Sequence, residues 1–212
     1  MSIKDAAIDI RHLLNRGYPQ QGAVKFVCDH YRLNEENRHM LLRTVVSGKI
    51  SEKRKMKFLP CDAIKGNNLV IDGYNIIIGM ESILEKKAFL CDDGVIRDIK
   101  GTFRNFRISG ITEKAIEMIM RFLKDENPAN VYFLLDSQIS KSGLLSEMLR
   151  EKMGYYGLKG YAKTSKHVDY DLKISKDIIV SSDGVIIDKA GRVVNFLPCI
   201  VARYGELEIQ KL

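Results

Sequence analysis

Three short apolar runs, each closed by an aspartate, constrain the fold of this 212-residue chain more than any other feature. They are LVID at residues 69–72, VYFLLD at residues 131–136 and DIIVSSD at residues 177–183. Continuous apolar strands that alternate with helical segments are typical of a parallel sheet buried on both faces. The sequence therefore predicts an α/β fold in which helices flank a parallel sheet.

The front of the chain has a different pattern, because its apolar residues recur at helical spacing in three successive segments. Gly17 and Pro19 separate the first two segments, and Asn34 is the predicted N-cap of the third. Residues 1–67 hold 13 Lys+Arg and 7 Asp+Glu, a net charge of +6 out of +7 for the whole chain. We therefore expect a basic all-α domain at residues 1–65 and an α/β domain at residues 66–212.

Two further segments of the α/β domain carry local signals. The residues Asp92, Asp93 and Gly94 lie between AFLC and VIRDI, which predicts a β-hairpin turn. The apolar segment VVNFLPCIV at residues 193–201 is expected to supply a late strand. Its FLPC motif also occurs at residues 58–61, but the flanking residues differ, so we interpret the repetition as chance.

The cysteines and the start of the chain predict a cytoplasmic protein. The four cysteines form no CxxC pair and are expected to be free thiols: Cys28, Cys61, Cys91 and Cys199. The first residues include acids and no small-residue cleavage site, so we expect no signal peptide. No run of about 18 apolar residues occurs, which predicts that no segment spans a membrane.

The strand-end acids predict a metal site. Open α/β sheets bind ligands beyond the carboxyl ends of their strands, so Asp72, Asp136 and Asp183 are expected to meet in one pocket. Asp169 begins a predicted helix and is expected there too, with Asp171 in reserve because residues two apart on a helix point to nearly opposite sides. Carboxylate oxygens of this kind hold Mg²⁺ or Mn²⁺. For any one aspartate, a turn or helix cap is the alternative.

Several polar and basic residues near these acids are candidates for phosphate or RNA binding. Asn75 could contact phosphate or orient a ligand, and a helix N-cap is the equal alternative. For the basic residues the alternative is an ordinary solvated surface. The full candidate set for phosphate and RNA is Asn75, Ser182, Lys163, Lys166, Lys53, Arg54 and Lys55.

The order of these motifs resembles the PIN/NYN nuclease superfamily. The motifs are DGYN from Asp72, LLD ending at Asp136, KHVD ending at Asp169, and SSDG containing Asp183. The first module, with LLNRGYP at residues 13–19, resembles the small helical domain found ahead of such a domain in the family catalogued as domain of unknown function 434. Together the two resemblances cover nearly the whole chain.

The resemblance implies a PIN-like parallel sheet flanked by helices and metal-dependent cleavage of single-stranded or structured RNA. Asp72, Asp136, Asp169 and Asp183 would be the catalytic, metal-binding acids, with Mg²⁺ or Mn²⁺ as cofactor. Many relatives carry a second acid in the last motif, where this chain has Val185. The early-helix glutamate of many PIN domains has only Glu81 and Glu113 as candidates. PIN-like domains often pair, so a homodimer stays open.

The main alternative to a ribonuclease is an inactive PIN-like module that binds RNA or a ribonucleoprotein, which the missing acid at Val185 supports. A phosphatase or nucleotide transferase is a weaker alternative, because a haloacid-type phosphatase needs an acid where Tyr74 stands. The chain has no GxxxxGK[ST] loop and no GxGxxG motif, so no nucleotide cofactor is expected.

Overall fold

The computed structural model describes residues 2–99, 106–205 and 207–212. The N-terminal part forms four helices: α1 (Ile3–Asn15), α2 (Gln20–His30), α3 (Glu35–Thr44) and α4 (Gly48–Lys57). Apolar side chains of α1, α2 and α3 form one small core that includes Ile10, Val24 and Leu41. As predicted, Asn34 caps α3 by accepting a hydrogen bond from the Asn37 backbone N–H at 2.9 Å.

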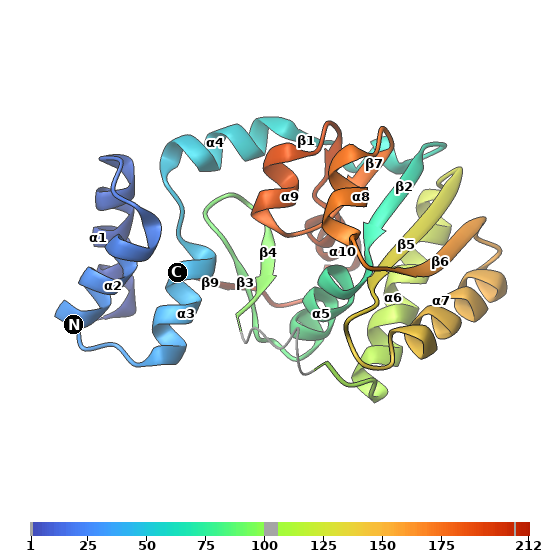
Figure 1. Cartoon of the computed structure of the whole chain (residues 1–212), viewed down its shortest axis with the longest axis horizontal. Coiled ribbons are helices and arrows are strands. Elements are labelled where there is room, and N and C mark those ends of the chain that lie inside the picture. Colours follow the sequence, from blue (N-terminus) through green and yellow to red (C-terminus); the bar gives the residue numbers. More distant parts are fainter. Residues whose placement is uncertain (1, 100–105, 206) are drawn as a thin grey trace.

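Helix α4 is the basic run SEKRKMK, which the sequence analysis did not assign to a helix. Ser47 caps it by accepting from the Ile50 backbone N–H at 3.3 Å. Only Ser51 and Arg54 of this helix are buried. Because α4 has almost no apolar face, the spacing of its apolar residues could not predict a helix. Its buried side chains, Ser51 and Arg54, make polar contacts with the rest of the protein. In Figure 1, α4 runs across the top of the molecule from the helical domain to the α/β domain.

The α/β domain is built on a six-stranded sheet in the order β1-β8-β7-β2-β5-β6. All its strand pairs are parallel, so the predicted sheet type is confirmed. Its strands are β1 (Phe58–Leu59), β2 (Asn68–Asp72), β5 (Asn130–Asp136), β6 (Gly160–Ser165), β7 (Ile178–Val180) and β8 (Val193–Val194). The three predicted apolar runs are the central strands β2, β5 and β7.

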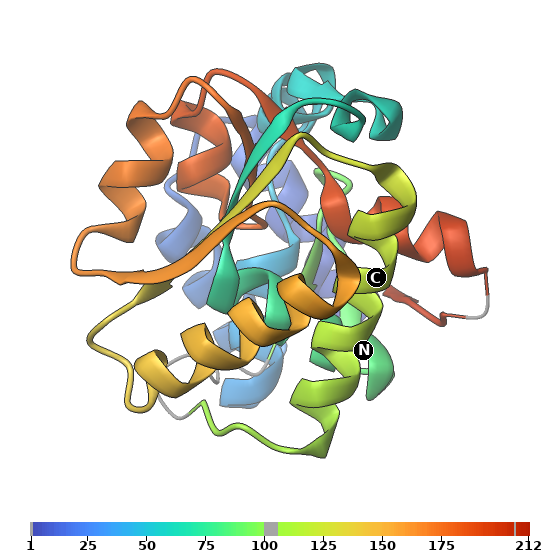
Figure 2. The ribbon, with the colours of Figure 1, turned by 90° about the vertical axis from the view of Figure 1, so that its right-hand side faces the viewer.

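Helices cover both faces of this sheet. One face packs against α5 (Gly73–Leu84), α6 (Gly110–Glu126), α7 (Ser142–Tyr156) and α10 (Phe196–Tyr204), with Leu69 and Ile71 of β2 pointing into that core. The other packs against α8 (Val168–Ile174) and α9 (Gly184–Lys189), with Val70 pointing into it. Figure 2 shows α8 and α9 on one side of the sheet and α6 and α10 on the other. Burial on both faces explains the continuous apolar runs.

A second, three-stranded sheet lies beside the main one, in the order β4-β3-β9. Strands β3 (Ala88–Leu90) and β4 (Ile96–Asp98) are antiparallel, which confirms the predicted hairpin. Gly94 has a φ of +79°, a conformation that glycine adopts without strain. The hairpin is joined by β9 (Gln210–Lys211), and the last residue, Leu212, packs against the core of the helical domain.

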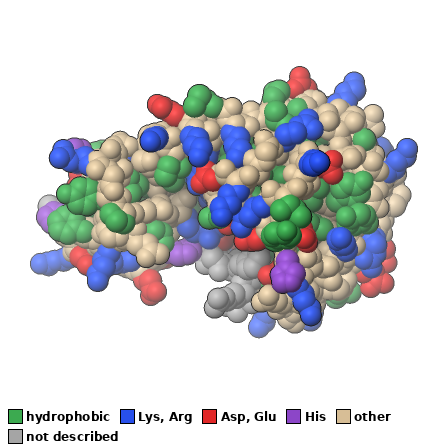
Figure 3. Space-filling view, turned by 45° about the horizontal axis from the view of Figure 1, so that its top comes forward, with side chains coloured by type: hydrophobic (Ala, Val, Ile, Leu, Met, Phe, Trp, Pro, Cys, Tyr) green, Lys and Arg blue, Asp and Glu red, His purple; other side chains and the backbone are tan. Residues whose placement is uncertain are grey.

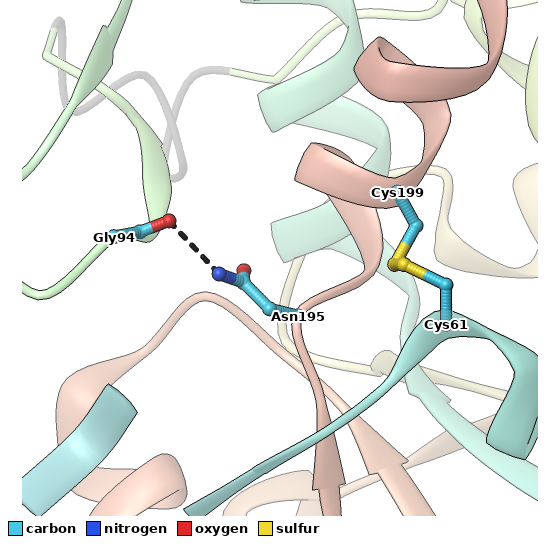
Figure 4. Close-up of a disulfide and its surroundings, with 4 residues drawn as sticks. All are labelled: Cys61, Gly94, Asn195 and Cys199. Carbon is cyan, nitrogen blue, oxygen red and sulfur yellow. Dashed lines mark hydrogen bonds between the residues drawn. A yellow bond between two sulfur atoms is a disulfide. The ribbon is translucent and has the colours of Figure 1, made fainter. Parts of the chain in front are cut away.

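A late strand does form in the segment VVNFLPCIV, whereas the prediction of four free cysteines was wrong. The segment VVNFLPCIV forms only the two-residue strand β8, and α10 begins at Phe196. Pro198 stands in the first turn of α10, where its missing N–H costs no helical hydrogen bond. Cys61 and Cys199 are joined in a disulfide between the 3₁₀ helix η1 (Cys61–Ile64) and α10, so these two are not free thiols (Figure 4). The two FLPC motifs thus supply both sulfurs, whereas Cys28 and Cys91 are free and buried.

Among the described helices, none is both long enough and apolar enough to cross a membrane.

Candidate active site

Asp72 lies where the order of strands in the main sheet reverses. The chain leaves β2 toward β5 on one side, whereas β7 pairs with β2 on the other. In open α/β sheets such a switch point forms a crevice at the carboxyl ends of the strands. Gly73 follows directly and packs closely, because an added Cβ would lie 2.6 Å from the Leu135 side chain. The backbone turn that presents Asp72 therefore requires glycine here.

The Asp72 carboxyl is buried, with 8% of its residue surface exposed. It caps α5 by accepting from the Asn75 backbone N–H at 3.4 Å, and it accepts from the Ser181 hydroxyl at 3.0 Å. Burial raises its pKa to about 7, and the nearby Asp183 and Asp169 charges add to this increase, although the two hydrogen bonds oppose it. Asp72 is thus a carboxyl group that can hold or release a proton near neutral pH.

A pocket of about 260 Å³ opens over Asp72. All four aspartates that the sequence analysis placed in one site line it: Asp72, Asp136, Asp169 and Asp183. They come from the ends of β2 and β5, the start of α8 and the N-cap of α9. The reserve residue, Asp171, does not line this pocket, and its carboxylate instead accepts from the Ser165 hydroxyl at 2.7 Å.

The pocket acids differ in how firmly they are held. Asp136 accepts from the Gln138 backbone N–H at 2.8 Å, and Asp183 accepts from the backbone N–H groups of Val185 and Ile186 at 2.6 and 3.3 Å. Asp169 is exposed, with 73% of its side-chain surface accessible, and among the described residues its carboxylate pairs with Lys173 at 3.4 Å. Asp72, Asp136 and Asp183 are therefore held in place by backbone hydrogen bonds, whereas the Asp169 carboxylate is the one free to move.

Carboxylate oxygens are suitable ligands for Mg²⁺ or Mn²⁺. In the described part of the chain, however, no three His, Cys, Asp or Glu side chains are grouped closely enough to hold a metal ion. The donor set therefore fits a hard cation in chemistry, but an ion would need a change of rotamer to gather its ligands. An exposed side chain such as that of Asp169 changes rotamers on the picosecond to nanosecond scale.

Asn75 and Ser182 form one side of the same pocket. Asn75 Oδ1 accepts from the Ser182 backbone N–H at 2.8 Å and also accepts from the Ser182 hydroxyl. This pair ties the first turn of α5 to the loop after β7. Because Oδ1 is engaged, a phosphate oxygen at this position would be met by the Nδ2 donor of Asn75.

Two pocket residues escaped the sequence analysis. Asp98, at the end of β4, lines the pocket with 5% of its surface exposed, and it accepts from the Ser82 hydroxyl at 3.1 Å. Arg43, near the end of α3, also lines it. VIRDI indicated only a hairpin strand, and Arg43 belongs to another domain. No local pattern could place either residue at the carboxyl edge of the main sheet.

The predicted basic residues lie outside this pocket. Lys53 and Lys55 are exposed on α4, Lys163 is exposed on β6 beside the ring of Tyr161, and Lys166 is exposed in the following turn. They remain available to an anionic partner.

Arg54 is different from its neighbours on α4, because its guanidinium is buried and paired. It donates to Asp93 at 2.7 Å and to Asp188 at 2.8 Å. Arg54 therefore holds α4 to the hairpin and to α9, and its role in phosphate or RNA binding stays a prediction. Gly184 makes room for it, since an added Cβ would lie 2.4 Å from the Arg54 guanidinium.

Two families match this chain. The family described as "Protein of unknown function (DUF434)" matches residues 2–57, and the family described as "Domain of unknown function (DUF5616)" matches residues 61–199. An uncharacterised protein of Methanocaldococcus jannaschii is 38% identical over 188 residues, which is 88% of this chain and 89% of the relative. The chain therefore belongs to the DUF5616 family, and its N-terminal residues 2–57 match the DUF434 family. No solved structure matches it.

The pocket draws on both matched regions. Its five aspartates fall within the DUF5616 match, and Arg43 falls within the DUF434 match.

Proposed function

We propose that this protein is a PIN-like, metal-dependent ribonuclease whose active site is the acidic pocket. The observation that carries the proposal is the convergence of Asp72, Asp136, Asp169 and Asp183 on one pocket at the switch point of a parallel sheet. These acids come from four separate segments, and such convergence is unusual for residues that serve only as turns or caps. Repulsion among neighbouring carboxylates favours a divalent cation.

In this mechanism, the four aspartates would hold Mg²⁺ or Mn²⁺, which neutralises phosphate charge and lowers the pKa of bound water. Asp72, kept in place by Ser181 and the Asn75 backbone N–H, is buried where water is scarce, so its charge acts strongly on whatever binds beside it. The Asn75 Nδ2 group can donate to a phosphate oxygen, and the Ser182 contact fixes its orientation. The exposed Asp169 would turn its carboxylate toward the bound ion, since it would repel the phosphodiester itself.

The second candidate is a PIN-like module that binds RNA or a ribonucleoprotein without cutting. Two observations favour it. Val185 stands where many relatives of the PIN type carry a second acid, and no three acids of the described chain are grouped to hold an ion. This candidate predicts RNA binding that survives loss of the pocket acids.

Cleavage of a mixed set of single-stranded RNAs with Mn²⁺ separates the two candidates. The nuclease proposal expects metal-dependent cutting that falls by at least about 100-fold in Asp72→Asn and Asp183→Asn, since both lose a ligand charge at the reacting phosphate. Asp125→Asn, an exposed acid on α6, is the matched control and should cut at the wild-type rate. RNA bound but left intact by folded wild-type protein would favour the binding module.

A further inference from the structure

Arg43 has an unusual position for a basic residue of the helical domain. It lies one residue before the end of α3, yet it lines the acidic pocket of the α/β domain. Its Nε is buried and has no hydrogen-bond partner among the described residues. A guanidinium beside several aspartates usually forms forked ion pairs with them. Arg43 instead keeps an unpaired Nε donor in the wall of the pocket, and a phosphate oxygen that enters the pocket is a suitable acceptor for its guanidinium.

The contacts beside Arg43 fix where it stands. Its neighbour Thr44 accepts from the Asp92 backbone N–H at 3.0 Å, and the Val46 backbone N–H donates to the Asp92 carboxylate at 3.2 Å. The same carboxylate receives two hydrogen bonds from Arg11, each of 2.8 Å. A forked arginine–carboxylate pair imposes a defined geometry. These hydrogen bonds fix the end of α3 to the β3–β4 hairpin. They therefore hold Arg43 between the two domains.

A larger groove of about 720 Å³ continues from the acidic pocket between the two domains. The groove and the pocket share Arg43, Asn75, Ser182 and Asp183. Farther from the acids, its wall includes three apolar side chains that are unusually exposed: Tyr18 at 55%, Ile50 at 40% and Val185 at 54%. The groove thus has a polar end with a free arginine donor and an apolar end with an aromatic ring.

The charge around this groove suits a polyanion. The helical domain holds most of the net positive charge of the chain, and α4 carries exposed lysines. Figure 3 shows Lys and Arg side chains gathered over the middle of one face, where α4 joins the two domains. Single-stranded nucleic acid is bound by this combination of a basic groove that follows the backbone and an aromatic side chain that stacks on a base.

We propose that the interdomain groove binds the single RNA strand that enters the acidic pocket, with Arg43 on a backbone phosphate and Tyr18 stacked on a neighbouring base. The inference rests on the proposed function for its choice of substrate. It assigns the helical domain a direct part in the site, as the source of both the phosphate donor and the stacking ring. Val185, where many relatives carry an acid, then belongs to the apolar wall of the strand path.

The test is the affinity of full-length protein for a short fluorescein-labelled single-stranded RNA in EDTA, followed by fluorescence anisotropy. Without divalent ions the RNA stays intact, so binding is measured apart from cutting. We expect Arg43→Gln to weaken binding by about tenfold and to reduce the slope of log K against log salt by about 1. Tyr18→Ala should weaken binding by about tenfold as well, the size of one lost base–aromatic contact.

Each variant has a matched control away from the groove. Arg203→Gln removes the charge of an exposed arginine on α10, and Tyr155→Ala removes an exposed tyrosine ring on α7. Both should bind as the wild type does. Arg43→Lys should recover part of the affinity and the full salt slope, because it restores the charge without the forked geometry. Thermal unfolding of each variant confirms that the comparison is made between folded proteins.

The outcomes separate this inference from the nuclease proposal. Binding that depends on Arg43 and Tyr18 without any Mn²⁺-dependent cutting would support the groove and overturn the nuclease. Cutting by the wild type, with Arg43→Gln and Tyr18→Ala no weaker in binding than their controls, would overturn the groove and leave the nuclease. No binding of RNA by the wild type would also overturn the groove.

Discussion

At the scale of single residues, Asp72 shows how one position serves both fold and proposed chemistry. Its carboxyl caps α5, a role that asparagine fills equally well. Its burial, however, penalises the charged form, so the folded protein binds the Asp72 proton more tightly than the unfolded chain does. Capping α5 requires only a hydrogen-bond acceptor of this size at position 72. The negative charge of Asp72 is required only by the proposed metal site.

This difference predicts that Asp72→Asn changes how stability depends on pH. With a pKa of about 7 in the folded state against an ordinary 3.8, Asp72 makes wild-type protein lose stability as pH rises from about 4 to 7. The loss is on the order of 4 kcal/mol, from about three pKa units. Asp72→Asn cannot ionise, and the Ser181 hydroxyl can rotate to accept from the new amide. Urea unfolding of both proteins at pH 5 and pH 8 measures the difference.

The variant should therefore be the more stable protein at pH 8 and should lose that advantage at pH 5. Mg²⁺ at pH 8 should stabilise wild-type protein and leave Asp72→Asn unchanged, because a ligand that binds only the folded state raises its stability. A constant difference between the two proteins across this pH range would contradict the assignment of a raised pKa to Asp72.

At the scale of elements, the β3–β4 hairpin holds the site together. Asp93 in its turn is fully buried and pairs with Arg54 of α4 and Arg97 of β4, each at 2.7 Å. Burial by itself would raise the pKa of Asp93, but the two guanidinium groups outweigh it and lower the pKa. Arg97 also donates to the Ser182 carbonyl at 2.8 Å, which anchors the loop that carries Asp183.

We expect Asp93→Asn to lower the free energy of unfolding by about 3–5 kcal/mol, since it leaves two buried arginines with too little negative charge. Urea denaturation measures this change, and Asp125→Asn, an isosteric change at an exposed site, should shift the midpoint very little. A loss below about 1 kcal/mol, the value typical of a surface pair, would mean that the arginines find other partners.

The elements also show which parts of the structure a sequence can predict. Strands β2, β5 and β7 are continuous apolar runs, and this pattern predicted both the strands and their parallel pairing. It also predicted that the aspartates at the ends of these runs would meet in one pocket. Helix α4 has few apolar residues, and the FLPC segment of α10 is apolar all round, so periodicity failed for both. Asp98 reaches the pocket from the second sheet and Arg43 reaches it from the helical domain, and no spacing within one element encodes either placement.

At the scale of the whole molecule, the two domains are joined by several links that are distant in sequence. Arg11 binds Asp92, and Leu212 packs on the helical core. Within the α/β domain, the Asn195 side chain donates to the Gly94 carbonyl at 2.8 Å and ties the hairpin turn to the start of α10 (Figure 4). These links make the groove between the domains a defined surface. The helical domain is therefore a component of the candidate site, because it supplies Arg43 to the pocket.

The Cys61–Cys199 disulfide should contribute measurably to this architecture. It spans 138 residues and joins η1, at the start of the α/β domain, to α10. Because a cross-link over so long a segment restricts the unfolded chain, Cys61→Ser with Cys199→Ser should lower the free energy of unfolding by about 2–5 kcal/mol. Adding a reductant to wild-type protein should give the same loss, whereas the double variant should not respond. A reductant that leaves wild-type stability unchanged would show that the bond does not form in solution.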